Sequence, residues 1–165
     1  MQLLISDANI LIDLEEGRLI DELFKLPFEF GIPDILFTEE LEDEHRPLIG
    51  MGLQLKELSA DTMEFALTLT AKYTKASRND CFALALATQE NCPLLTGDRA
   101  LRDAAETESV VVNGTLWLVD LMVRQGLIDI VRARESYEAM KDAGRRLPWA
   151  VAEAKLNELA VDSDK

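Results

Sequence analysis

The stretch "ISDANILIDL", residues 5–14, joins a short apolar segment to a helical pattern and carries an acid at the junction. Residues 3–6 are typical of a short buried strand. The apolar positions after them follow helical spacing up to Gly17, a predicted C-cap. Asp7 lies where the first pattern gives way to the second. Because its flanks are apolar, its carboxylate costs free energy unless another group compensates the charge. The first question about this chain is therefore what Asp7 pairs with.

Strand patterns and helix patterns alternate along most of the chain. Strands are predicted at 3–6, 28–33, 53–58, 92–96 and 109–112. After the helix that ends at Gly17, helices are predicted at 19–26, 34–44, 61–73, 80–90, 99–107, 116–125, 131–142 and 148–160, with a loop at 45–52. This alternation favours a parallel sheet covered on both faces, which is a three-layer α/β/α domain. We expect one domain, residues 1–165, in which 126–165 form a C-terminal helical extension.

Capping patterns predict where three of these helices begin. Asp61 with Glu64, and Ser77 with Asp80, have the spacing of a capping box. Thr115 follows an Asn-Gly turn and is the expected N-cap of the next helix.

The C-terminal extension carries apolar residues that need a surface to cover them. Trp149, Val151, Leu156 and Leu159 are expected to pack on the domain, and a dimer face is the alternative. A homodimer is otherwise unsupported by the residues themselves.

The formal net charge of −14 limits the ways in which the protein can meet nucleic acid. Passive electrostatic binding needs a basic face, but bound cations would let an acidic protein contact phosphates. The charge also fits simple solubility. No stretch reaches the roughly 18 apolar residues of a membrane span, and the start lacks a signal-peptide pattern. With two cysteines and no metal-ligand spacing, we expect a cytoplasmic location and no membrane partner.

Several acids are expected at the carboxyl edge of the sheet, where open parallel sheets form their sites. Asp7 follows the first strand, Asp98 follows another, Asp80 opens a helix, and Glu39 and Glu40 lie on the helix after the second strand. Each also has a structural interpretation, as a helix cap or as part of a solvated face. Together they predict a carboxylate cluster, which stays ionised only beside a compensating cation. Oxygen-only ligands suit Mg²⁺ or Mn²⁺.

The sequence offers few residues for a zinc site, a nucleotide-binding loop or a nucleophilic catalytic site. His45, the single histidine, lies in the predicted loop and is expected to be a surface residue rather than a zinc ligand. The chain has no Walker A loop, no Gly-rich dinucleotide loop and no evident Ser-His-Asp or Cys-His arrangement. Asp13 is expected to face outward, about one helical turn from the site.

Four segments, in order, resemble the motifs of PIN-domain nucleases. "SDANILIDL" is similar to the opening Asp-x-Asn motif of the family, and "DILFTEEL" to its second acidic segment. "SRNDCFALALA" resembles the third motif, an Asp followed by an alanine-rich helix. "CPLLTGDRALRDAA" resembles the fourth, in which Thr-Gly-Asp ends a strand. The resemblance covers about residues 1–125.

The resemblance implies a metal-dependent ribonuclease, in a family that includes the VapC-like toxins of toxin–antitoxin pairs. Asp7, Glu40, Asp80 and Asp98 would be the catalytic acids and would bind Mg²⁺ or Mn²⁺. Glu40 is preferred to its neighbour because it directly precedes a leucine, as in the family pattern. The resemblance answers the opening question with a hypothesis, in which Asp7 pairs with a metal ion that activates a water.

Further residues would assist these acids if the resemblance holds. Asn9 would orient Asp7, Thr96 would lie beside Asp98, and Asp103 would be an outer acid. The resemblance also implies RNA as the substrate, an antitoxin protein as a partner, and a homodimer.

Three arginines lie near the motif acids in the sequence. Arg78, Arg99 and Arg102 would contact RNA phosphates in the functional interpretation. Surface positions, or ion pairs with nearby acids, are the structural alternative.

Two other functional interpretations stay open. A non-catalytic module on the same fold would hold RNA or a protein without cutting it. A phosphoryl-transfer protein would also place an Asp after its first strand. However, a haloacid-dehalogenase-like phosphatase needs a second Asp where Asn9 stands, and a receiver needs a lysine that "SVVVNG" lacks.

Overall fold

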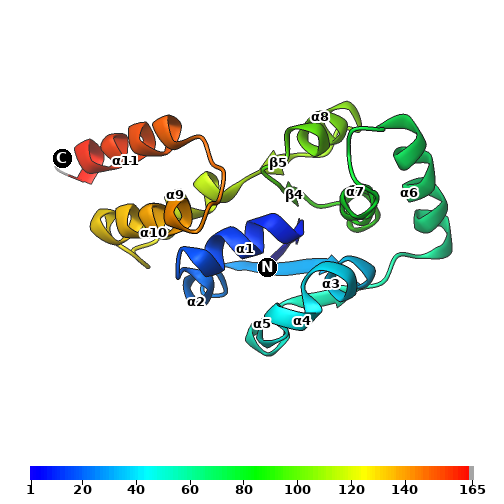
Figure 1. Ribbon diagram of the computed structural model, residues 1–165, viewed down its shortest axis with the longest axis horizontal. Coiled ribbons are helices and arrows are strands. Elements are labelled where there is room, and N and C mark those ends of the chain that lie inside the picture. The colour runs from blue at the N-terminus through cyan, green and yellow to red at the C-terminus, as the bar shows by residue number, and fades with distance from the viewer. Residues whose placement is uncertain (164–165) are drawn as a thin grey trace.

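A computed structural model describes residues 1–163, and within them five parallel strands form one sheet (Figure 1). The strands are β1 Gln2–Ser6, β2 Phe28–Pro33, β3 Gln54–Lys56, β4 Leu94–Leu95 and β5 Val112–Asn113. Their order across the sheet is β3-β2-β1-β4-β5. The chain moves outward from β1 in one direction and returns to its other side at β4, so β1 and β4 flank a topological switch point. The predicted three-layer α/β/α fold with a central parallel sheet is confirmed.

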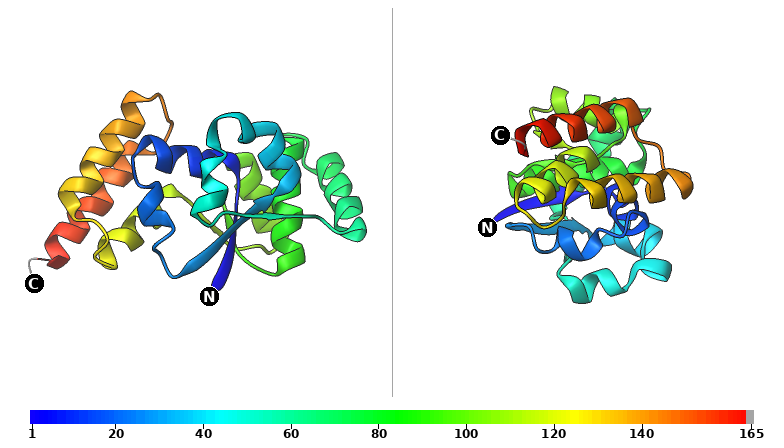
Figure 2. Two further views of the ribbon diagram at one scale, coloured as in Figure 1. Left: turned by 90° about the horizontal axis from the view of Figure 1, so that it is seen from below. Right: turned by 90° about the vertical axis from the view of Figure 1, so that its left-hand side faces the viewer.

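Helices connect and cover the strands. Their bounds are α1 Ala8–Glu16, α2 Ile20–Leu23, α3 Asp34–Glu40, α4 Glu42–His45, α5 Pro47–Met51, α6 Ala60–Lys72, α7 Arg78–Glu90, α8 Arg99–Thr107, α9 Thr115–Arg124, α10 Ile130–Asp142 and α11 Trp149–Ser163. Figures 1 and 2 show α6, α7 and α8 at one end of the molecule and α9, α10 and α11 at the other, with α1 between the two groups. Among residues 1–163, no helix is long and apolar enough to cross a bilayer.

Helix α7 is the most enclosed of the helices around the switch point. Every residue from Cys81 to Ala87 is buried, and the helix packs against β1 and β2 on one side and α6 on the other. A helix that is apolar on all sides belongs in a core. The alanines of "CFALALA" let the neighbouring backbones approach closely, which brings the start of α7 to the ends of the central strands.

The C-terminal helices pack on the sheet domain through α1 and α9. Gly17 ends α1 against α10, where an added Cβ would lie 2.5 Å from Met140 Cε. Leu156 and Leu159 are buried, and the Trp149 ring meets the Tyr137 ring edge-on. These three residues therefore pack within the chain itself, as expected, whereas Val151 stays exposed.

Several of the predicted element boundaries are wrong. The predicted loop at 45–52 contains α5, because Pro47 is already set for a first helical turn and Leu48 anchors that turn in the core. Helix α6 starts before Asp61, since the Ser59 hydroxyl accepts the Thr62 N–H at 3.1 Å and is the cap. A serine cap satisfies an N–H group that would otherwise be unpaired.

The start of α9 also differs from the prediction. Gly114 is its N-cap, and the Thr115 hydroxyl donates instead to Asp13 at 2.9 Å. Strand β5 begins later than the predicted 109–112, because Ser109 has a φ of 63° and Val110 N–H still donates to the Ala105 carbonyl of α8. At α9 a long-range contact outweighs the local capping preference, whereas at β5 the C-terminal cap of α8 delays the start of the strand.

The enclosure of α7 predicts the effect of a larger side chain. Ala85→Leu adds three carbons at a position with 0% exposure, and overpacking should lower the free energy of unfolding by about 1–3 kcal/mol. Urea denaturation measures this change. Ala71→Leu, on the exposed side of α6, is the matched control and should shift stability by less than about 0.5 kcal/mol. Equal effects of the two substitutions would contradict the packing described for α7.

Candidate functional site

Asp7 follows β1 directly and is the N-cap of α1. Its Oδ1 accepts the Ile10 N–H at 3.0 Å, and its Oδ2 accepts the Thr96 hydroxyl at 2.5 Å. The residue is 1% exposed, and within residues 1–163 neither oxygen meets a basic side chain. Burial raises the pKa of Asp7 from 3.8 to about 7, although both hydrogen bonds act to lower it. The fold therefore holds a carboxylate whose charge the protein alone does not compensate.

Thr96 links the two strands at the switch point. Strand β1 pairs with β4 in parallel, with Ser6 opposite Leu95, so the residues that follow the two strands meet. The Thr96 hydroxyl donates to Asp7 and accepts the Asp98 N–H at 3.0 Å. Asp98 is also the N-cap of α8, because its Oδ1 accepts the Leu101 N–H at 3.0 Å. Its cap role and its link to Asp7 through the Thr96 hydroxyl are thus compatible.

Asp80 lies in the first turn of α7 and joins the same group of charges. Its N–H donates to the Ser77 hydroxyl at 3.0 Å, as the predicted capping box requires. Burial raises the pKa of its carboxyl group, and the charges of Asp98 and Glu40 raise it further. The charge of Asp80 in turn raises the pKa of Asp7. Electrostatic interactions therefore connect all four of the predicted acids.

The two glutamates of α3 contact the start of α7 but differ in their partners. Glu39 Oε1 accepts from Arg78 Nη2 at 2.6 Å, and Asn79 Nδ2 donates to Oε2 at 3.0 Å. Hydrogen bonds from Asn79 and Arg78 lower the pKa of Glu39. Among residues 1–163, Glu40 Oε2 accepts a hydrogen bond only from the Asn79 amide, at 3.2 Å. Arg78 thus compensates the charge of Glu39. The charge of Glu40 instead acts on Asp80.

Asn79 was missed by sequence reasoning. Its Nδ2 bridges the two glutamates, and its Oδ1 is buried without a hydrogen-bond partner among the described residues. An orphaned buried oxygen of this kind costs about 1–3 kcal/mol. Its position next to Asp80 in the sequence was the signal that could have drawn attention to it.

The two remaining residues named from the sequence, Asn9 and Asp103, are both exposed. Asn9 is exposed, and its Oδ1 accepts from Arg145 Nη2 at 3.1 Å, while Ile10 and Thr96 orient Asp7. Asp103 is exposed on α8.

His45 is not a free surface residue. It lies on α4, and its ring contacts the Glu15 carboxylate across to α1, so the side chain is only 14% exposed. The contact holds α4 against α1 and does not involve the four acids.

Asp13 is buried, which corrects the expectation that it faces outward. It lies four residues after Asn9, so the two side chains share one face of α1 and can meet the same partner. Arg145 Nε donates to its Oδ1 at 2.7 Å, and the Thr115 hydroxyl donates to Oδ2 at 2.9 Å. Arg145 was missed, because a residue in a C-terminal loop gives no local sign of contacting α1.

The donor chemistry of the four acids fits a hard divalent cation. All the candidate ligand atoms are carboxylate oxygens. Burial raises the pKa values of Asp7 and Asp80, and the charges of neighbouring acids raise them further. Within residues 1–163, however, no three acidic side chains lie close enough together to form a metal-binding group. A bound cation would have to bring these side chains closer together.

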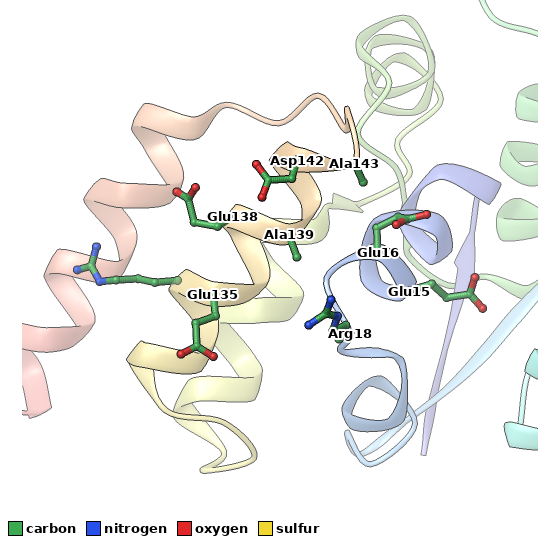
Figure 3. Close-up of a pocket in the computed structure, with 9 residues that line it drawn as sticks. Glu15, Glu16, Arg18, Glu135, Glu138, Ala139, Asp142 and Ala143 are labelled. Carbon is green, nitrogen blue, oxygen red and sulfur yellow. The ribbon is translucent and has the colours of Figure 1, made fainter.

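Two cavities lie outside this group of acids. One of about 700 Å³ lies between the end of α1 and α10, and Figure 3 shows the side chains that line it, with Glu15 and Arg18 from one side and Glu138 from the other. A second, of about 260 Å³, lies between the α6–α7 connection and α8, where Lys75 and Asp103 line it. Neither contains Asp7, Asp80 or Asp98.

The fold is a three-layer α/β/α protein whose buried Asp7 lies at the switch point of a parallel sheet. A family model described as a PIN domain matches residues 3–160, so the chain belongs to the PIN-domain family. This is a nuclease-type fold, and PIN domains commonly are nucleases that use divalent metals. No curated protein matches the chain.

The burial of Asp7 predicts how stability depends on pH in the absence of divalent metal. Because the pKa of Asp7 is about 7 in the folded chain and near 3.8 when unfolded, the native state binds more protons between these values. Stability should therefore fall as pH rises from about 4 to about 7. Asp7→Asn should be more stable than the wild type at about pH 8, by up to about 4 kcal/mol, and no more stable at about pH 4.

Urea denaturation in EDTA at several pH values measures this difference. Asp129→Asn, at the exposed N-cap of α10, removes a comparable charge and should give no such pH-dependent gain. A constant difference between Asp7→Asn and the wild type at every pH would contradict a raised pKa.

Proposed function

We propose that the protein is a metal-dependent ribonuclease that cleaves phosphodiester bonds in RNA. The observation that carries the proposal is the Thr96 hydroxyl, which ties Asp7 to Asp98 at the switch point while Asp80 shares their field. An uncompensated carboxylate with 1% exposure costs stability, and a catalytic site justifies that cost. Membership of a family that is commonly nucleolytic agrees with this assignment.

In the proposed site, Asp7, Glu40, Asp80 and Asp98 hold Mg²⁺ or Mn²⁺. A bound cation of this kind supplies charge stabilisation to the phosphodiester and lowers the pKa of an attacking water. Thr96 fixes the orientation of Asp7, and Asn79 fixes Glu40. One of these acids accepts the proton of the water.

The arginines around the acids supply the contacts that an RNA backbone needs. Arg99 and Arg102 are exposed in α8, directly after Asp98, and are assigned to phosphates on either side of the cut. Arg78 is already paired with Glu39 and stacks over the Phe82 ring at 5.5 Å. Its proposed role is to hold Glu39 of α3 against the start of α7, which leaves Arg99 and Arg102 to contact the substrate.

Within this proposal, the protein is the toxin of a toxin–antitoxin pair. An acidic site suits an enzyme that a bound antitoxin protein silences by covering the acids. A homodimer and a cytoplasmic location belong to the same proposal. Sedimentation measures the first, and fractionation of the source cells measures the second.

A non-catalytic module on the same fold is the second candidate. It is favoured by one observation, which is that no three of the acids come together as a metal group within residues 1–163. Such a module would bind RNA or a protein without requiring the carboxylates. The two candidates therefore differ in whether loss of one carboxylate abolishes an activity.

The proposal predicts the loss of cleavage when Asp98 loses its charge. Asp98→Asn keeps a good N-cap for α8, so the fold should persist. Mn²⁺-dependent cleavage of single-stranded RNA should fall about 100-fold or more, because a ligand and its charge are gone. Gel analysis of labelled RNA measures the rate.

Asp129→Asn is the matched control, because Asp129 caps α10 in the same way, with its Oδ1 accepting the Arg132 N–H at 2.8 Å. It should cleave like the wild type. Equal cleavage by Asp98→Asn and the wild type would eliminate this site, and an absence of cleavage and of bound Mn²⁺ in the wild type would favour the non-catalytic module.

The toxin assignment predicts growth arrest in a bacterial host. Induction of the wild-type chain should stop growth, while induction of Asp98→Asn at the same protein level should not, because arrest requires RNA cleavage. Colony counts and total RNA integrity measure the two effects. Arrest that persists with Asp98→Asn would show that any toxicity has another cause.

A further inference from the structure

Arg145 connects the C-terminal helices to the helix that Asp7 caps. It lies in the loop between α10 and α11, and its guanidinium reaches the first two turns of α1. Its Nε donates to Asp13 Oδ1 at 2.7 Å. Its Nη2 donates to Asn9 twice, to Oδ1 at 3.1 Å and to the main-chain oxygen at 3.4 Å. One planar group therefore holds two successive turns of α1.

Asp13 makes this contact rigid. The residue is 6% exposed, and its second oxygen accepts the Thr115 hydroxyl from the first residue of α9 at 2.9 Å. Burial raises the pKa of Asp13, while Arg145 and Thr115 both act to lower it. A half-buried arginine on a buried carboxylate is costly to leave unpaired, so the loop, α1 and α9 stay together.

The turn that Arg145 holds is the one that positions Asp7. Asp7 caps α1 through the Ile10 N–H, and Asn9 is the residue just before Ile10. Any shift of that turn moves the Ile10 N–H relative to Asp7 Oδ1. Since Asp7 has no basic partner of its own among residues 1–163, its orientation depends on this turn and on Thr96.

We propose that Arg145 is a positioning residue for the metal site, which it serves by fixing Asn9 and the first turn of α1 so that the Asp7 carboxylate stays oriented toward the other acids. This inference rests on the proposed function. It assigns the C-terminal helices a part in the site beyond packing. Groups that orient a metal ligand typically contribute 10–100-fold to metal affinity.

Arg132, on α10, provides a matched control near the other end of α1. Its Nη2 contacts Glu22 Oε1 at 2.7 Å and donates to the Arg18 carbonyl at 3.1 Å. It therefore clamps α10 to the segment after α1 in the same chemical way, but at the end of α1 remote from Asp7. Loss of either arginine loosens the packing, and only the loss of Arg145 should disturb the site.

The experiment compares Arg145→Met with Arg132→Met in the full-length protein. Mn²⁺ affinity is measured by calorimetry without RNA, and exchange of the Ile10 amide is measured by NMR without metal. Arg145→Met should weaken Mn²⁺ binding roughly tenfold. It should also speed Ile10 exchange about tenfold, because the turn opens more often. Arg132→Met should leave both values unchanged, even if its urea midpoint falls equally.

Arg145→Lys keeps the test decisive if Arg145→Met fails to fold. A lysine ammonium can pair with Asp13 but lacks the planar fork that reaches Asn9 as well. It should therefore preserve the urea midpoint and still weaken Mn²⁺ binding.

The outcomes separate this inference from the proposed function. Wild-type affinity for Mn²⁺ in Arg145→Met or Arg145→Lys would overturn the role of Arg145 alone. Equal weakening by Arg132→Met would also overturn it, because general bracing would then suffice. Absence of Mn²⁺ binding by the wild type would overturn the proposed function and the metal role together, and unchanged Ile10 exchange would overturn the ordering of the turn.

Discussion

The hydrogen bond from the Thr96 hydroxyl to Asp7 is the contact on which the rest of the site depends. It exists because β4 returns to lie beside β1, so that the residues after the two strands face each other. The same hydroxyl accepts the Asp98 N–H, which sets the start of α8. Without that contact, Asp7 would keep only the Ile10 N–H as a partner for a carboxylate that is almost wholly out of water.

The acids around Thr96 are graded by their partners. Glu39 is neutralised by Arg78, Glu40 receives an amide, and Asp7 receives two neutral donors. Burial raises the pKa values of Asp7 and Asp80 because it removes water from the charged oxygens, and neighbouring acids raise both further. The chain's net charge of −14 does not conflict with RNA binding in this proposal. The proposed metal, rather than the protein surface, provides the positive charge that phosphates require.

Helix α1 is held along its whole length by the C-terminal helices. Arg145 contacts its first two turns, and Met140 packs against Gly17 at its end. The segment 126–160 therefore supports the helix that Asp7 caps, as well as burying its own leucines. In the proposed role of Arg145, its long-range contact with α1 keeps the capping residue Asp7 in a fixed orientation.

The sequence by itself determined the elements whose causes are local. The change from strand to helix at Asp7, the Ser77 cap with Asp80, and the Asp98 cap all follow from side-chain period and capping chemistry within a few residues. The alternation of patterns also determined the fold class. These features depend only on neighbouring residues, so they can be predicted from the sequence alone.

Only the tertiary structure decided which of these residues meet. Thr96 contacts Asp7 across 89 positions, and Arg145 contacts Asp13 across 132. Such pairs form because strands and helices pack in one particular order, and no local pattern encodes that order. The same packing overrode local preferences worth about 1 kcal/mol, as when the Thr115 hydroxyl bonded to Asp13 instead of capping α9. Asp13 was misjudged for this reason, because its partners come from α9 and from the loop before α11.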